Sequence, residues 1–264
     1  MLETVKERLR QIRCYHLANG LESSLQQAQD NEVSYLAFLD DLLRQELAGR
    51  DQHRLKRQLK QAKFPAIKTI DDFDFSFQTT IRKKQVNGWL TCDWLEQRHN
   101  KILMGPPGVG KTHLAIAVGY AAIFRSFKVR FYPLPQLIEE MILADDSREF
   151  DRWLKTVLKN DLIIIDELGY LPLKPVYANL FFQLVNHCYE YRSLLITSNK
   201  LFTEWGVYFG NQTIATAILD RLLHHAEAVV LDGDSYRLRG KLNGNGLVTG
   251  STANAGKRDT GKGG

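Results

Sequence analysis

An apolar run, a glycine-rich turn and a helical pattern follow one another in the middle of the chain. Ile102-Leu103-Met104 predicts a buried strand, and His113–Phe124 predicts a helix. The turn between them, Gly105-Pro-Pro-Gly-Val-Gly-Lys-Thr112, matches every fixed position of the pattern G-x-x-x-x-G-K-[ST]. Such an order places backbone N–H groups and the positive end of a helix at one point. The segment therefore predicts a polyphosphate site at the end of a strand.

The residues of this turn have separate expected roles. Lys111 is expected to reach the β- and γ-phosphates of ATP and is counted among the catalytic candidates, and the Thr112 hydroxyl is expected to bind Mg²⁺. A chance match in a glycine-rich loop is the alternative, and the flanking strand and helix argue against it. The predicted nucleotide contacts are Gly105, Pro106, Pro107, Gly108, Val109, Gly110, Lys111, Thr112 and His113.

Two carboxylates end a second apolar run, Leu162-Ile-Ile-Ile-Asp166-Glu167. In nucleotide hydrolases of this type an acidic residue here holds Mg²⁺, directly or through water. We assign that role, and a nucleotide contact, to Asp166. Glu167 is expected to orient and activate the attacking water as general base. A buried strand that happens to end in exposed acids is the alternative, and the upstream turn weakens it.

A third buried run, Ser193-Leu-Leu-Ile-Thr-Ser-Asn199, also ends in polar groups. The Asn199 amide is expected to hydrogen-bond the γ-phosphate or the attacking water, with Thr197 and Ser198 as possible substitutes. A turn-forming asparagine after a strand is an equally weighted alternative. In parallel sheets the carboxyl ends of the strands meet at one edge, so all three motifs are expected to share one site.

Arg221 lies in the amphipathic pattern Ala217-Ile-Leu-Asp-Arg-Leu-Leu. An arginine on a rigid helix can stabilise the charge on a neighbouring subunit's γ-phosphate. Composition alone favours the alternative, a structural ion pair or a solvated face beside Asp220. Arg237 and Arg239 alternate along a predicted strand and are expected to point the same way.

The predicted fold is an α/β P-loop NTPase domain with a five-stranded parallel sheet, because apolar runs alternate with helical patterns. A connector covers residues 66–80. Short helices are expected at 80–87 and 91–98, and a helix-rich insert at 134–159. The predicted strands are 100–104, 128–132, 161–166, 193–198 and 227–231.

Residues 1–65 predict a small all-helical module that binds DNA or a partner. One helix is expected to stop at Gly20. A second, with an apolar stripe from Val33 to Leu47, is expected to be capped by Asp30 or Asn31 and closed by Gly49. A third is expected from Asp51 to Ala62, and the module as a whole should leave one polar face for a partner. Its DNA-binding candidates are Arg50, Arg54, Lys56, Arg57, Lys60 and Lys63.

Composition narrows the class further. The 35 Lys and Arg residues outnumber the 30 Asp and Glu, which makes nucleic acid a reasonable partner. Three scattered cysteines indicate reduced thiols in a cytoplasmic protein, and their spacing predicts no metal site. No segment is expected to be a signal peptide or to span a membrane. Domain boundaries are predicted at 1–65, 66–242 and 243–264, the last a disordered Gly-rich tail.

These motifs together resemble the IstB-like AAA+ ATPases, helper proteins of transposable elements that are related to DnaC-type helicase loaders. The likeness covers roughly residues 30–240. It rests on Gly-Pro-Pro-Gly-Val-Gly-Lys-Thr-His-Leu-Ala, Asp166-Glu-Leu-Gly-Tyr-Leu-Pro, Leu-Ile-Thr-Ser-Asn199, Ile-Leu-Asp-Arg221-Leu-Leu-His-His-Ala-Glu and Gly233-Asp-Ser-Tyr-Arg-Leu-Arg. Phe202 to Gly210 favours the transposition branch over the helicase loaders.

The resemblance implies an ATPase that forms homo-oligomers on duplex DNA when ATP is bound and assists a transposase. It implies that Asn199 is the polar sensor and that Arg221 acts on the next subunit. The insert at 134–159 resembles an element that contacts DNA in relatives, and its nearest cations are Lys155, Lys159 and Arg152.

The chain departs from the family in two places. The segment Asn186-His-Cys-Tyr-Glu190 lacks a cation that is usual there. After Leu242, no separate C-terminal lid is expected. Three other functions stay open. The protein could load a replicative helicase onto single-stranded DNA, act as an ATP-switched scaffold, or be a small-molecule kinase. The last would need a substrate site and lid that the sequence does not predict.

Overall fold

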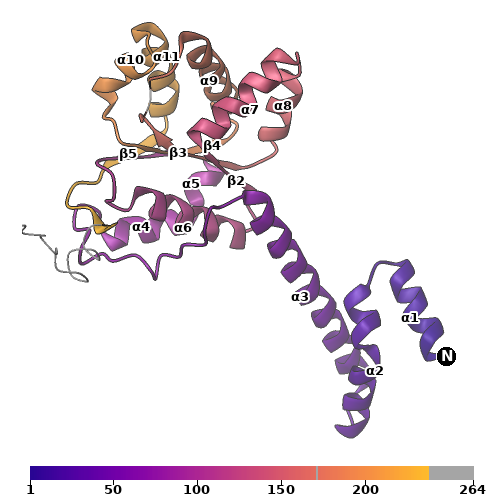
Figure 1. Cartoon of the computed structure of the whole chain (residues 1–264). Helices are drawn as coiled ribbons and strands as arrows, with labels where there is room; N and C mark the ends of the chain where they lie inside the picture. Colours follow the sequence, from indigo (N-terminus) through magenta and orange to yellow (C-terminus); the bar gives the residue numbers. More distant parts are fainter. Residues whose placement is uncertain (171, 238–264) are drawn as a thin grey trace, which may run out of the picture.

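Five parallel strands form the centre of the computed structural model, which describes residues 1–170 and 172–237 (Figure 1). Their order across the sheet is β2-β3-β4-β1-β5. Every strand lies within two residues of its predicted bounds. The strands are β1 Asn100–Met104, β2 Val129–Pro133, β3 Leu162–Leu168, β4 Ser193–Ser198 and β5 Ala226–Val230.

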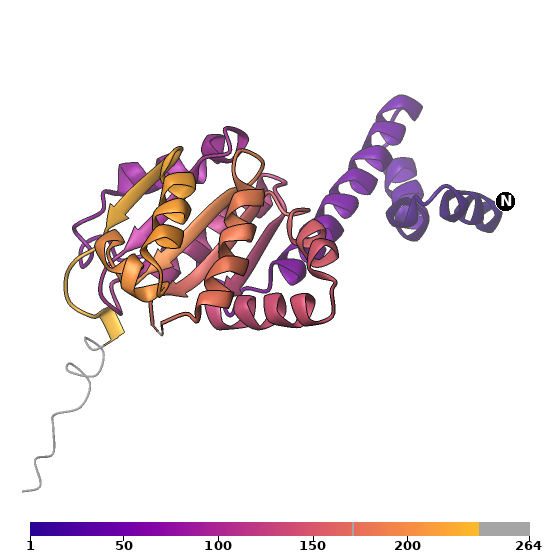
Figure 2. The ribbon, with the colours of Figure 1, turned by 90° about the horizontal axis from the view of Figure 1, so that it is seen from above.

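Helices cover both faces of this sheet, as Figures 1 and 2 show. Because both faces are covered, β1 and β4 are buried along their whole length. One face carries α4 Lys83–Leu90, α5 Asp93–Glu96 and α6 Lys111–Phe124. The other carries α7 Leu134–Asp146, α8 Phe150–Val157, α9 Pro175–Cys188, α10 Trp205–Tyr208 and α11 Gln212–Leu223, with a 3₁₀ turn, η1, at Phe202–Glu204.

The strand order brings the three sequence motifs together. β4 lies between β1 and β3, and all three strands are parallel. Their carboxyl ends therefore open at the same edge of the sheet, where ligands bind in doubly wound folds. This edge receives the glycine-rich turn after Met104, the carboxylates that end β3, and Asn199.

The N-terminal residues form three helices rather than the predicted set. These are α1 Leu2–Gln11, α2 Tyr15–Asp30 and α3 Tyr35–Ala62. Leu17, Leu21 and Leu42 make a small core where α2 packs on α3. The far end of α3 packs on the sheet domain through Leu55 and Ala62. Figure 1 shows α3 as one rod that joins the two parts.

Two glycines do not end helices as predicted. Gly20 lies inside α2, and Gly49 lies inside α3, so the two expected helices at 33–62 are one. A Cβ on Gly49 would stand 2.3 Å from the His16 ring. Glycine is therefore kept there by the close approach of α2, and tertiary packing outweighs its helix-breaking tendency. The N-cap is Ser34, whose hydroxyl accepts from Ala37 N at 3.3 Å, and not Asp30 or Asn31.

The N-terminal part leaves apolar side chains of α3 exposed, and the polar face for a partner stays a prediction. Of the predicted stripe, Leu42 is buried against α2. The other four leucines of the stripe are exposed: Leu36, Leu39, Leu43 and Leu47.

The end of the described chain also differs from the prediction. Tyr236 and Arg237 have helical backbone where a strand was expected. Arg239 and the predicted tail at 243–264 lie outside the described residues, and the domain boundaries at 65 and 242 stay predictions. Cys14, Cys92 and Cys188 are free thiols. Among the described helices, none is both long and apolar enough to cross a membrane.

Candidate functional site

The turn after β1 has the backbone shape that its glycines predict. Gly105, Gly108 and Gly110 have φ values of +139°, +88° and +97°, which residues with a Cβ rarely adopt. A Cβ on Gly105 would lie 1.9 Å from the carbonyl oxygen of Leu231. The N–H groups of Gly108 and Gly110 have no hydrogen bond to any described residue. Free donors just before a helix N-terminus form a nest that suits an anion.

Lys111 is the first residue of α6, and its side chain is buried against the turn. Its Nζ donates hydrogen bonds to the carbonyl oxygens of Gly105 and Pro106, each at 2.7 Å. Burial lowers the pKa of Lys111 to about 8; two nearby carboxylates oppose this change, and Arg237 adds to it. The site thus disfavours a bare ammonium and favours one that is paired with an anion.

Asp166 receives hydrogen bonds from two threonines. Thr112 Oγ1 donates to its Oδ1 at 2.9 Å, and Thr197 Oγ1 donates to the same oxygen. Burial raises the pKa of Asp166, and both hydroxyls act in the opposite direction. A hydroxyl beside a buried carboxylate supplies the oxygen ligands that Mg²⁺ takes in proteins. The donor set at Thr112 and Asp166 therefore fits the predicted ion.

Glu167 has an uncommon backbone conformation, with φ of +70°. The pairing of β3 with β4 shifts between Ile165 and Leu168, and such a bulge re-aims the side chains within it. Glu167 N donates to Thr197 Oγ1 at 3.0 Å. Thr197 thus contacts both acidic residues: it bonds the backbone of Glu167 and the side chain of Asp166. The Glu167 carboxylate is exposed and lines the same cavity as the glycine-rich turn.

Asn199 directly follows β4 and lines this cavity. Its Oδ1 is buried and has no hydrogen-bond partner among the described residues. Ser198 Oγ is bonded to the backbone of Lys200, and Thr197 is bonded to Asp166. This oxygen lies against Gly169, where an added Cβ would be 2.3 Å away, and a buried oxygen without a partner costs free energy that a bound ligand can offset.

The cavity has a volume of about 360 Å³, within the range of small-molecule sites. Its far wall is aromatic. Phe77 and Tyr236 meet edge to face at 5.2 Å, and Phe73 meets His113 at 5.4 Å, both between ring centroids. The predicted residues that line it are Pro107, Gly108, Val109, Gly110, Lys111, Thr112, His113, Glu167 and Asn199; Gly105, Pro106 and Asp166 are not among its described lining residues.

Sequence reasoning missed the aromatic wall. It treated residues 66–80 as a connector, yet Phe73 and Phe77 enclose the cavity, and His113 Nε2 lies 2.8 Å from the carbonyl oxygen of Thr69. Tyr236 and Arg237 also line it. The repeated phenylalanines at 73, 75 and 77 were a usable signal, since such a run in a polar segment needs a surface to cover.

Arg221 lies at the opposite end of the sheet. It stands near the end of α11, and Asn100, the first residue of β1, donates from Nδ2 to Leu222 O at 3.0 Å. The glycine-rich turn follows the other end of β1, roughly 13 Å away along the strand. Arg221 is not among the described residues that line the cavity of its own chain.

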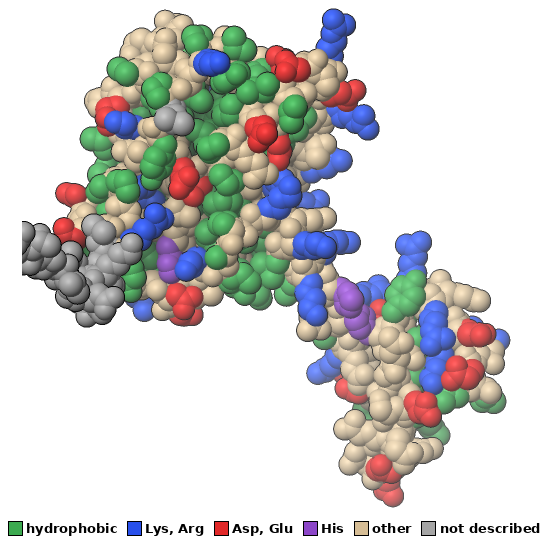
Figure 3. Space-filling view, in the orientation of Figure 1, with side chains coloured by type: hydrophobic (Ala, Val, Ile, Leu, Met, Phe, Trp, Pro, Cys, Tyr) green, Lys and Arg blue, Asp and Glu red, His purple; other side chains and the backbone are tan. Residues whose placement is uncertain are grey.

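The six predicted DNA-binding cations of the N-terminal part fall into two groups. Arg50 pairs with Glu46 at 2.7 Å, and Arg54 pairs with Asp51 at 3.2 Å, so both have partners within the module. No ion pair to a described residue is recorded for the other four, which we call the cationic neck: Lys56, Arg57, Lys60 and Lys63. Figure 3 shows cationic side chains along α3 where it meets the sheet domain. Lys155 and Lys159 are exposed on and just after α8, which Figures 1 and 2 place beside this end of α3.

Comparison with known proteins gives a consistent result. A sequence model of the family described as "IstB-like ATP binding protein" matches residues 7–244. The chain is 43% identical over 244 residues to the insertion sequence IS21 putative ATP-binding protein of Pseudomonas aeruginosa, which covers 92% of each chain. It is 37% identical over 241 residues to the IS5376 putative ATP-binding protein of Geobacillus stearothermophilus, covering 91% of this chain and 96% of the relative.

Solved structures share the fold at lower identity. DnaI matches with a TM-score of 0.53 and 17% identity, over 62% of this chain and 90% of that one. AMPPCP-bound DnaA from Aquifex aeolicus matches with a TM-score of 0.53 and 19% identity, over 70% of this chain and 57% of that one. These likenesses establish the AAA+ fold of the sheet domain.

Proposed function

The chain belongs to the IstB-like ATP binding protein family, and from that premise we propose that it is a DNA-dependent ATPase that assists a transposase. It binds ATP with Mg²⁺, forms homo-oligomers on duplex DNA, and hydrolyses ATP between subunits. The observation that carries the proposal is one cavity with a free N–H nest, the buried Lys111, the Glu167 carboxylate and the unpaired Asn199 oxygen at a single sheet edge.

Binding of ATP would use both ends of the cavity. The phosphates would take the free N–H groups of Gly108 and Gly110, and Lys111 would leave its two carbonyl partners to meet the β- and γ-phosphates. The base would stack among Phe73, Phe77 and Tyr236. Mg²⁺ at Thr112 and Asp166 would supply charge neutralisation of the phosphates.

Hydrolysis needs a base, a sensor and a countercharge. Glu167 would accept the proton of the attacking water, and its bulged backbone would hold the carboxylate at the cavity. The free oxygen of Asn199 would orient that water. Because Arg221 is at the far end of the sheet, it would stabilise the γ-phosphate of the next subunit rather than its own.

Nucleotide binding should take up a proton at alkaline pH. Phosphates favour charged Lys111, so they would raise its pKa from about 8 toward the ordinary 10.5. Between these values the complex holds a proton that the free protein lacks, and affinity should fall as pH rises through about 8. Calorimetric titration with ADP at pH 8.5, where its phosphates are already ionised, in buffers of different ionisation enthalpy measures the uptake.

The matched control for this linkage is Lys111→Arg. A guanidinium stays charged throughout this pH range, so its complex should form without proton uptake if it binds at all. Equal uptake by the wild type and Lys111→Arg would assign the proton to another group. No uptake by the wild type would contradict a pKa of Lys111 that is lowered in the free protein and restored by phosphates.

DNA contact is assigned to the cationic neck and to Lys155 and Lys159. The double variant Lys56→Glu/Lys60→Glu should weaken duplex binding and lower the slope of log affinity against log salt by about two, because each lost phosphate contact removes about one. Fluorescence anisotropy with random-sequence duplexes at several salt concentrations measures both. The exposed pair Lys83→Glu/Lys84→Glu on α4 changes the net charge equally and should leave the slope unchanged.

Electron microscopy tests the proposal as a whole. The protein is imaged on duplex and on single-stranded DNA, with a non-hydrolysable ATP analogue or with ADP, beside Lys111→Ala as a non-binding control. Ordered assemblies on duplex DNA with the ATP analogue alone are expected. A preference for single strands would instead favour loading of a helicase, and identical images with both nucleotides would contradict an ATP-driven assembly.

A further inference from the structure

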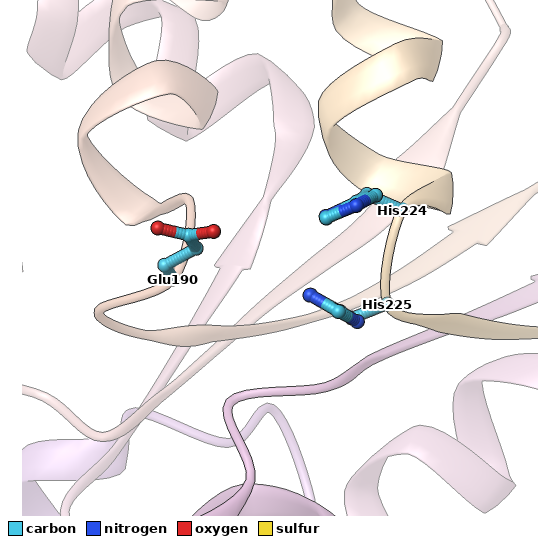
Figure 4. Close-up of side chains that lie close together, drawn as sticks. All are labelled: Glu190, His224 and His225. Atoms are coloured by element: carbon cyan, nitrogen blue, oxygen red, sulfur yellow. The ribbon is translucent and has the colours of Figure 1, made fainter.

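Three metal-binding side chains lie together at the end of the sheet opposite the cavity. Glu190 follows the end of α9, and His224 and His225 follow the end of α11 (Figure 4). One ligand atom of each lies within 4.8 Å of the other two, and all three side chains are exposed. Neither the nucleotide site nor the proposed DNA surface uses them. Their distance in the sequence is why no motif predicted them.

The chemistry of the cluster suits a borderline-soft divalent ion. Imidazole nitrogens and one carboxylate are the ligands of open Zn²⁺ sites, where ligand atoms stand about 2.0–2.2 Å from the metal and roughly 3.4 Å from one another. Closing from 4.8 Å to that spacing requires shifts of about 1 Å in exposed side chains. A single carboxylate is too few oxygen ligands for Ca²⁺, and Mg²⁺ rarely takes imidazole.

Neighbouring groups orient both imidazoles. The Tyr189 hydroxyl lies 2.8 Å from His224 Nδ1, which leaves Nε2 as the nitrogen open to an ion. The His225 ring stacks on His99 with a centroid distance of 5.4 Å and an interplanar angle of 10°. The carbonyl oxygen of His225 accepts from Asn100 N at 2.7 Å, which fixes the backbone to β1.

We propose that Glu190, His224 and His225 form a binding site for a divalent transition-metal ion of the Zn²⁺ class. The protein provides three ligands, and water or a group from a partner completes the coordination. Because the ligands come from the ends of two helices, the ion joins α9 to α11. The backbone of Glu190, at φ of +62°, is the part that metal binding holds in place.

The same two helices hold Arg221. Its Nε donates to Asn186 Oδ1 at 2.7 Å, and its guanidinium lies 4.9 Å from the centroid of the Phe182 ring. Asn186 is one helical turn before Glu190, and Arg221 is about one turn before His224. An ion that joins the ends of α9 and α11 therefore holds in place the two helices that position Arg221. This consequence, unlike the binding itself, rests on the proposed function.

Metal titration of the full chain without nucleotide tests the site. Metal-free protein is titrated with Zn²⁺ in a calorimeter and with Co²⁺ in a spectrophotometer. One ion per chain is expected, with Co²⁺ visible bands of low coordination number. Glu190→Gln and His225→Ala should each weaken Zn²⁺ binding at least ten-fold, because each removes a direct ligand. Thermal unfolding without metal checks that the variants are folded.

Two histidine variants serve as controls. His187→Ala removes an exposed imidazole on α9 whose Nδ1 is bonded to Gln183 O, outside the cluster. His53→Ala removes one ring of the His16–His53 pair on the N-terminal helices. Both should bind Zn²⁺ as the wild type does. Absence of binding, or equal binding by every variant, would overturn the proposal.

The two proposals can fail separately. Arg221→Ala keeps all three ligands, so its Zn²⁺ affinity should equal that of the wild type whatever happens to hydrolysis. If the chain binds Zn²⁺ through this cluster but never hydrolyses ATP, the metal site stands and the proposed function falls. If the chain hydrolyses ATP and the Glu190→Gln variant binds Zn²⁺ normally, the proposed function stands and the metal site falls.

Discussion

Glu167→Gln will bind ATP as tightly as the wild type and hydrolyse it about 10²–10⁴-fold more slowly. Glutamine has the same shape but cannot accept the proton of water. Its backbone N–H keeps the bond to Thr197 Oγ1, so the bulge persists and only the proton acceptor is lost. Phosphate release under single-turnover conditions measures the rate, and equilibrium binding of a fluorescent ATP analogue measures the affinity.

The control for this variant is Glu139→Gln, which makes the same chemical change at an exposed position of α7. Its hydrolysis and binding should match the wild type. If Glu167→Gln hydrolyses ATP at the normal rate, the Glu167 carboxylate has only a structural role and the base lies elsewhere in the cavity. Reduced binding with a normal rate would mean that Glu167 contacts the nucleotide in the ground state.

Arg221→Ala will lose about 10³-fold or more in hydrolysis, the scale of an arginine finger, although the residue lies far from its own cavity. The physical reason is removal of a positive charge from the transition state of the neighbouring subunit. A mixture with Glu167→Gln is the sharper measurement. Glu167→Gln subunits offer an intact Arg221, and Arg221→Ala subunits offer an intact base. Two inactive proteins should therefore regain part of the activity when mixed.

Asp220→Asn provides a neighbouring exposed control on α11 and should change hydrolysis little. The mixture contradicts the assignment if it stays inactive while both variants still assemble. The assignment also fails if Arg221→Ala alone hydrolyses ATP normally at high protein concentration. In that case the bond to Asn186 and the contact with Phe182 would define a purely structural arginine.

The sheet was predictable because its three central strands, β1, β3 and β4, are buried on both faces and end at turns. Ile163 to Ile165 and Leu194 to Ile196 are continuous apolar runs, and the length of such runs separates strands from helices. The glycine-rich turn followed from its spacing. The site motifs converge because parallel topology leaves no other arrangement for the ends of neighbouring strands.

The features that sequence reasoning missed depend on contacts between distant residues. Gly49 continues a helix because His16 packs on it, and nothing near Gly49 in the chain reports that contact. The left-handed backbone of Glu167 depends on a shifted pairing with β4. Phe73 lines the cavity because the segment 66–80 folds back over α6. Rules based on local sequence patterns do not predict these contacts.

The single rod formed by α3 has a geometric consequence. A helix of 28 residues is about 42 Å long, and it is stiff over that length, unlike a flexible tether. Each N-terminal group of helices is therefore displaced from its own sheet domain by one fixed vector. If the sheet domains form a ring or a spiral, the N-terminal groups of helices follow the same rotation and the same rise per subunit, but at a different radius. A change in angle between two neighbouring sheet domains is thus amplified into a larger displacement at the tips, as with a lever.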